Sequence, residues 1–275
     1  MIIKRVVGCA GVLACFIACR AVGDPIATVD GDEPSPWVTG SIELEVLSGN
    51  LWHGILLNDE PVFQPSVTVE ALGFGANLWA NYDFTDAYSD EAPAFTEVDY
   101  TLYYSFSVAP FNFTFGYSTY TYPNTTETIE NADGTITCRD LDDSQLVYGY
   151  VEMPDLLVVP SLLVEYTFES EETIYAACGL TYERELSNTL TAEVGGTLAW
   201  GNADYHRYQF DVDKNALSEA KTTVALIWQP TTHVALTASL TYAYFVDSAI
   251  ADGAKACGYD APDALVGGLK AGFSF

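Results

Sequence analysis

The sequence predicts an all-β fold, an antiparallel up-and-down transmembrane β-barrel of about 12 strands, and three observations predict it. Apolar and polar residues alternate with a period of two over most of the chain, as in a sheet with one apolar and one polar face. The connections alternate between short turns and long, acidic loops. The chain ends on an alternating strand whose last residue is Phe275. An even strand count with such connections is the layout of an outer-membrane barrel.

The N-terminal region predicts export from the cytoplasm. Two basic residues precede an apolar run that is shorter than the roughly 20 residues of a spanning helix. We therefore interpret residues 1–23 as a secretory signal peptide, with an N-terminal anchor or lipidation at Cys19 as alternatives. Residues 24–37 are acidic and rich in Pro and Gly, which predicts a flexible lead-in. The barrel itself is expected over 38–275, in a bacterial outer membrane.

Six strands are predicted in the N-terminal half of this region. The stretch 97–108 shows the pattern most clearly, because Tyr100 and Leu102 fall on one face while Asp99 and Thr101 fall on the other. The six strands are expected at 38–46, 66–71, 74–84, 97–108, 111–118 and 144–152. The sixth has ambiguous parity, because apolar residues occupy both of its faces.

Six more strands are predicted in the C-terminal half. In one of them Leu236, Leu240 and Tyr244 alternate with Thr237 and Thr241. These strands are expected at 162–169, 174–183, 190–200, 219–228, 234–244 and 268–275. Short turns are expected near 72, 109, 153, 185 and 229, and long loops at 48–64, 85–95, 123–143, 201–216 and 246–262; the short link near 171 is the exception.

Alternation alone does not separate a membrane barrel from a soluble β-sandwich or a lipocalin-like barrel, which would bury the apolar face. Three features favour the membrane barrel. The strands are about ten residues long, as a tilted span requires. The polar face carries small residues, among them Gly116, Gly149 and Gly179. Aromatic residues stand near the strand ends, as in an interfacial girdle: Phe84, Trp200, Trp228, Tyr244, Phe273 and Phe275.

Two stretches resemble known proteins. The ending GLKAGFSF resembles the C-terminal signal of bacterial outer-membrane proteins, which implies recognition by the barrel-assembly machinery. Residues 48–84 are similar to the first hairpins of the TorF-type porin family, through Gly54, PVFQPS at 61–66 and GFGANLWANYDF; VVPSLLVEYTF also fits. His53 stands where such proteins often carry Arg. The resemblance implies a barrel and a porin label, with no known solute.

The polar face of the predicted barrel is acidic. Carboxylates in a confined lumen attract cations, so we predict a narrow, cation-preferring channel for passive diffusion of small solutes. A non-conducting interior is the alternative, because twelve strands lie between eight, which side chains fill, and sixteen, which leave a channel. The candidate pore-lining residues are Glu43, Glu45, Glu70, Asp83, Glu97, Asp99, Glu165, Glu169, Glu183, Glu193, Glu219, Lys221 and Lys270.

Enzymatic and nucleic-acid functions have little support. The formal net charge of −28 repels nucleic acid. None of the three histidines lies in a recognisable Ser–His signature, although a hydrolase site at the loop rim, using His53 or His206, is a further alternative. The acidic stretch 211–219 lacks the Gly and Glu that a calcium loop needs, so no metal or other cofactor is predicted. The expected partners are lipid, the assembly machinery, and small solutes or cations.

Two cysteines fall in different long loops on the same predicted side. In an oxidising compartment such thiols can pair, and a bond between Cys138 and Cys257 would contribute on the order of 4–5 kcal/mol in the chain-entropy model. The alternative is two free thiols.

Overall fold

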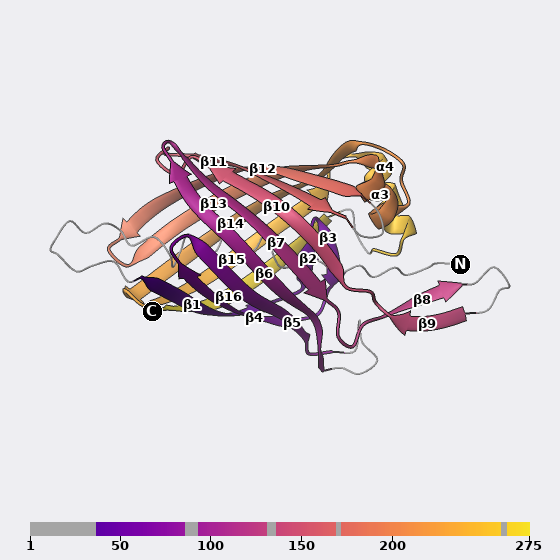
Figure 1. Ribbon diagram of the computed structural model, residues 1–275, viewed down its shortest axis with the longest axis horizontal. Helices are drawn as coiled ribbons and strands as arrows, with labels where there is room; N and C mark the ends of the chain where they lie inside the picture. Colours follow the sequence, from indigo (N-terminus) through magenta and orange to yellow (C-terminus); the bar gives the residue numbers. More distant parts are fainter. Residues whose placement is uncertain (1–36, 86–92, 131–135, 169–171, 260–262) are drawn as a thin grey trace.

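The computed structural model describes residues 37–85, 93–130, 136–168, 172–259 and 263–275. For residues 126–130 and 136–140 it describes the backbone alone. The predicted signal peptide and nearly all of the lead-in lie outside these residues. Twelve strands close into an antiparallel barrel (Figure 1). They are β1 (Val38–Leu47), β4 (Val62–Ala71), β5 (Phe74–Asp83), β6 (Ala94–Val108), β7 (Phe111–Thr121), β10 (Ser144–Glu152), β11 (Val159–Thr167), β12 (Thr173–Ser187), β13 (Leu190–Gly201), β14 (Ala216–Thr231), β15 (Val234–Phe245) and β16 (Asp263–Ser274).

The last strand closes the barrel against the first. β16 pairs antiparallel with β1, so that Ile42 lies opposite Phe273. The backbone N–H of Gly40 donates to the carbonyl of Phe275, and the N–H of Phe275 donates back, both at 2.9 Å. A Cβ on Gly40 would lie 2.7 Å from the Phe275 ring, so glycine leaves the space in which the terminal aromatic side chain lies.

The apolar face of the sheet points outward and the polar face points inward. On β6, Leu102 is 63% exposed, whereas Asp99, three residues away, is 1% exposed. The structure also resolves the parity of β10: Leu146 and Tyr148 face inward and Val147 faces outward. One prediction is corrected by the same rule, because Gly149 lies on the outer face, beside the exposed ring of Phe115.

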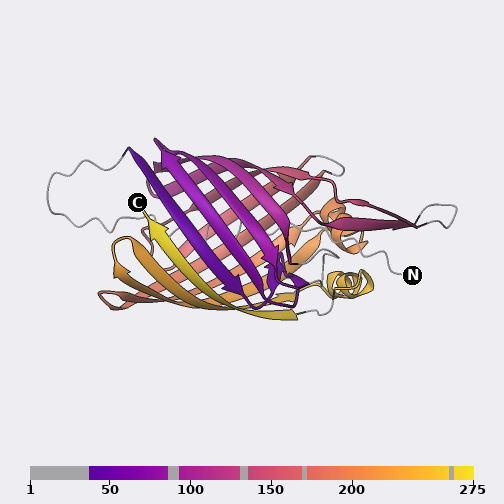
Figure 2. The same cartoon turned by 90° about the horizontal axis from the view of Figure 1, so that it is seen from below.

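The two ends of the barrel differ as the loop lengths predict. Figures 1 and 2 show the C-terminus at one end, and the helices α3 (Ala203–Phe210) and α4 (Ser248–Ala256) at the other. The tight turn at Leu72 and Gly73, where both residues have positive φ, lies at the C-terminal end. We call the two ends the short-turn end and the long-loop end.

Four of the predicted long loops contain regular structure that the alternation did not predict. The first, at 48–64, contains a short hairpin inside the barrel. Two others contain helices with polar N-caps: Asn202 accepts from the Tyr205 N–H, and Asp247 accepts from the Ala249 N–H. The fourth contains the hairpin of β8 (Thr126–Glu130) and β9 (Ile136–Asp140), which extends beyond the barrel (Figure 2). No helix in the described part of the chain is long and apolar enough to cross a membrane.

Candidate functional site in the barrel lumen

A short hairpin from the first long loop folds back into the barrel. Its strands are β2 (Asn50–Trp52) and β3 (Ile55–Asn58), joined by His53 and Gly54. Both turn residues have positive φ, 41° and 78°, as in the tight turns that match the twist of paired strands. A Cβ on Gly54 would lie 2.7 Å from the Cβ of Glu219. Glycine therefore lets the turn approach the inner wall of β14.

The imidazole of His53 is held on this wall by two rings and two polar groups. It stacks between Trp52 and Tyr175, with ring centroids 4.1 and 3.7 Å away. Its Nδ1 is 3.0 Å from the hydroxyl of Tyr205, and its Nε2 is 3.5 Å from a carboxylate oxygen of Glu165. These contacts come from β11, β12 and α3, so one side chain ties the hairpin tip to three further elements.

Burial lowers the pKa of His53 well below its ordinary value, and the charge of Lys221 lowers it further. The main cause is the loss of water around a ring that would otherwise carry a charge. A lowered pKa favours the neutral form of this imidazole. A neutral ring has a single N–H, and the contacts fit an Nε2–H that faces Glu165 while the Tyr205 hydroxyl donates to Nδ1.

The polar cluster continues along β14 towards the short-turn end. The hydroxyl of Tyr175 donates to Glu219, and Lys221 follows two residues later on the same face. The charges of Glu219 and Glu165 both act on the ammonium of Lys221. Two carboxylates and one ammonium thus lie in the wall on which the hairpin tip rests.

The base of the hairpin is held on the opposite wall by a chain of amides. The side-chain N–H₂ of Gln64 donates to Asn50 at 3.2 Å and to Asn81 at 3.0 Å. Asn81 in turn donates to Asp83 at 2.7 Å and to Thr96 at 2.9 Å. Because Gln64, Asn81 and Asp83 belong to β4 and β5, this network fixes the hairpin base to the barrel.

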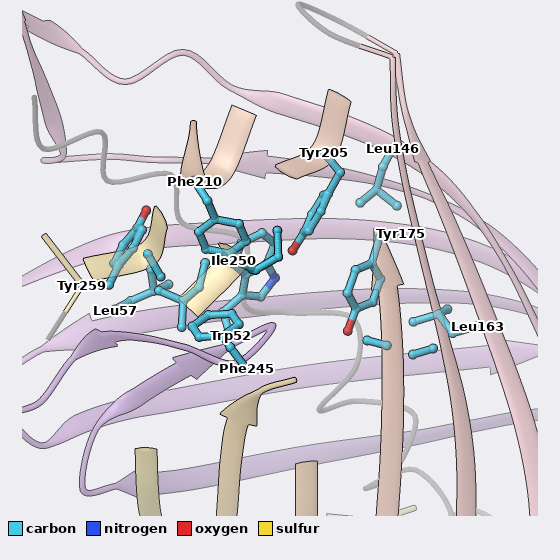
Figure 3. Close-up of a cluster of buried hydrophobic side chains, with 14 of the residues drawn as sticks. Trp52, Leu57, Leu146, Leu163, Tyr175, Tyr205, Phe210, Phe245, Ile250 and Tyr259 are labelled. Carbon is cyan, nitrogen blue, oxygen red and sulfur yellow. The ribbon is translucent and has the colours of Figure 1, made fainter. Parts of the chain in front are cut away.

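Apolar side chains fill the long-loop half of the lumen around the hairpin. Figure 3 shows Trp52 of the hairpin among Phe210 of α3, Ile250 of α4 and Phe245 of β15. The rings of Phe210 and Phe245 meet edge to face, with centroids 5.2 Å apart. Ile250 is completely buried. The hairpin and the two helices therefore narrow the barrel by side-chain packing.

The short-turn half of the lumen contains a cavity instead. It has an empty volume of about 690 Å³, which includes space open to solvent, and it is bounded by the inner faces of β10 to β14. Lys221, Glu193 and Glu152 contribute charge to its lining, and Glu152 accepts hydrogen bonds from Asn112 and Tyr150. Gly179 and Gly195 also belong to its wall. The lumen is thus packed with apolar side chains in its long-loop half and contains this cavity in its short-turn half.

The predicted lining acids of the described strands lie on the inner face, many of them with partners. The ammonium of Lys270 is 3.4 Å from Glu43, and the Tyr103 hydroxyl donates to Glu70 at 2.7 Å. Glu169 lies outside the described residues. The most buried carboxylates are those of Asp83, Glu97, Asp99, Glu165, Glu193 and Glu219, whereas Glu45, Glu70, Glu183 and Lys221 are more accessible.

The residues predicted for the aromatic girdle lie on the outer surface at both ends of the barrel. Phe84, Trp200 and Tyr244 lie towards the long-loop end, and Trp228, Phe273 and Phe275 lie towards the short-turn end. Cys257 follows α4 at the long-loop end. The side chain of Cys138 lies outside the described part of the structure, so the disulfide stays a prediction.

The alternation does not predict the residues that narrow the lumen. It places His53 on a long outer loop, whereas the structure buries this side chain inside the barrel. The buried Trp52, Ile55 and Leu57 fall in the same predicted loop. The signal for a hairpin is the run LWHGILL, in which His-Gly separates two short apolar segments as a tight hairpin turn does.

Comparison with known proteins supports the fold. No family model and no curated protein sequence matches the chain. Among solved structures, the KdgM porin in complex with disordered oligogalacturonate has a TM-score of 0.51 at 8% identity, over 86% of this chain and 99% of that one. The NanC porin has a TM-score of 0.49 at 12% identity, over 85% and 98%. OmpT, an outer membrane protein of Vibrio cholerae, has 0.39 at 7%, over 86% and 96%. At such identities the likeness to KdgM establishes the barrel fold alone.

Proposed function

We propose that the protein is an outer-membrane, porin-like channel for the passive diffusion of small solutes. The observation that carries this proposal is the direction of the sheet: side chains such as Leu102 and Leu269 are exposed on the outside, while Asp99 and Glu219 face the enclosed space. An apolar exterior of this kind is stable in lipid, and a polar interior holds water or solute. The fold shared with the KdgM porin agrees with this function.

The lumen charge favours cations over anions. Inward carboxylates far outnumber the two inward lysines along the described strands, and Lys270 already lies 3.4 Å from Glu43. A carboxylate that accepts a hydrogen bond keeps its charge, so partners such as Tyr103 for Glu70 do not remove the field. In a narrow, low-dielectric passage this field concentrates cations.

Replacing Glu43 and Glu45 together by Lys should weaken the cation preference. Both side chains lie on the inner face of β1, so the change moves the lumen charge by about four units at one level. The measurement is the reversal potential across a planar bilayer in a salt gradient. The exposed Glu172, which precedes β12, supplies the matched control Glu172→Lys. An unchanged reversal potential in the double variant, with conducting channels, would contradict the lining role of these residues.

The hydrolase alternative has less support. His53 faces Tyr205 and Glu165, and the Nδ1 of His206 lies 2.6 Å from the backbone carbonyl of Lys214. Neither contact set places an imidazole beside a serine hydroxyl, which a Ser–His nucleophile requires.

A further inference from the structure

We propose that the cavity in the short-turn half of the lumen binds short zwitterionic peptides of about dipeptide size. The carboxylate of such a solute would lie at Lys221 and its ammonium at Glu193. The inference deepens the proposed channel function by naming a solute class, and it rests on that function only for the route by which the solute arrives.

Opposite charges lie at different depths of one cavity. In the register of β13 and β14, Lys221 lies opposite Thr197, and Glu193 is four residues nearer the short-turn end on the same face. Four residues correspond to about 13 Å along the strand. A solute with a single charge meets a like charge at one of these levels, whereas a zwitterion can be matched at both.

Lys221 is the lysine that lines the cavity. Glu219, two residues before it on β14, accepts from Tyr175, and Glu165 of β11 lies 3.5 Å from His53. Both acids lie on the long-loop side of Lys221, away from Glu193. The other inward lysine of the described strands, Lys270, is not in the lining and lies 3.4 Å from Glu43.

The wall between the two charges suits a peptide group and small side chains. The hydroxyl residues Ser161, Thr181 and Thr223 line it, together with the apolar Leu163. An extended dipeptide spans about 7 Å, which leaves room for the lysine and glutamate side chains to reach its ends. The space beside Gly195 is open, because a Cβ there would meet no atom closer than 3.8 Å.

The test measures the binding of alanyl-alanine to the folded protein in detergent by isothermal titration calorimetry. The matched probes are N-acetyl-alanyl-alanine, which lacks the ammonium, alanyl-alanine amide, which lacks the carboxylate, and glucose. We expect alanyl-alanine to bind at least tenfold more tightly than each of them.

Two variants test the assigned charges. In Lys221→Met, alanyl-alanine and alanyl-alanine amide should bind equally, and Glu193→Gln should remove the preference for a free ammonium. Equal binding of all four probes, or no binding of the zwitterion, would overturn the proposal.

A second variant covers the case in which Lys221→Met fails to fold. Gly195→Leu extends a side chain into the cavity and should lower the affinity at least tenfold. Gly267→Leu is the matched control, because Gly267 lies on the outer face of β16 and a Cβ there meets no atom closer than 4.0 Å. Unreduced affinity in a folded Gly195→Leu protein would overturn the proposed site.

Conductance in potassium chloride, recorded on the same preparations, separates this inference from the channel. A conducting protein that binds no dipeptide would overturn the inference and leave the channel standing. A protein that binds dipeptide but conducts no current would overturn the channel and leave the binding site standing.

Discussion

Replacing residues 50–58 by a Gly/Ser linker of equal length should raise the single-channel conductance several-fold. The hairpin contributes Trp52, Ile55 and Leu57 to the packed half of the lumen, and its tip lies on the inner wall through His53. Without these side chains the narrowest part of the barrel widens, while the twelve strands keep their pairing. The measurement is the step size in a planar bilayer.

The hairpin of β8 and β9 supplies the matched control. It is also two-stranded, but it extends beyond the barrel (Figure 1). Replacing residues 127–139 by a linker should leave the step size near that of the natural protein. Equal steps in the natural protein and the 50–58 variant, both shown to be folded, would mean that the hairpin does not narrow the conducting path.

Leu102→Lys should destabilise the folded barrel in lipid by about 2–4 kcal/mol, the cost of a lysine at the midplane of a membrane barrel. Leu102 lies at the middle of β6, opposite Ala76 of β5, and points outward. There the ammonium would lose its water and face hydrocarbon. The measurement is the free energy of unfolding in vesicles, from guanidinium titration.

Leu72→Lys is the control for this measurement. Leu72 is 75% exposed but lies in the turn between β4 and β5, at the level where water and lipid headgroups are expected. Its replacement should change the free energy of unfolding by less than about 1 kcal/mol. A Leu102→Lys protein as stable as the control would show that this face of β6 does not contact hydrocarbon.

The outer surface could be predicted from the sequence because lipid acts on every strand in the same way. Each span must present apolar residues to lipid at every second position. The outward direction of Leu236 and Leu240 on β15 can therefore be inferred without knowing which strands lie beside them. β10 was ambiguous for a specific reason. Tyr148 points into the lumen and Val147 points outward, and both residue types are apolar enough to occupy either face.

The packed half of the lumen depends on contacts that no local pattern encodes. His53 meets Tyr205, 152 positions later in the chain, and Gly54 meets Glu219. Acidic surroundings made the segments of α3 and α4 resemble solvated loops, although Asn202 and Asp247 are good N-cap residues. The lining acids could be placed by parity, but their partners could not.

The most direct test compares nitroxide labels at neighbouring positions of β15, in a cysteine-free background reconstituted in vesicles. Leu240 points outward, and Thr241 points inward, where its hydroxyl is 3.0 Å from that of Thr223. We predict that a label at 240 is relaxed by oxygen, which dissolves in lipid, and that a label at 241 is relaxed by a water-soluble nickel chelate. A label at 240 that is shielded from both agents, beside one at 241 that is open to bulk water, would contradict a barrel whose apolar face contacts lipid.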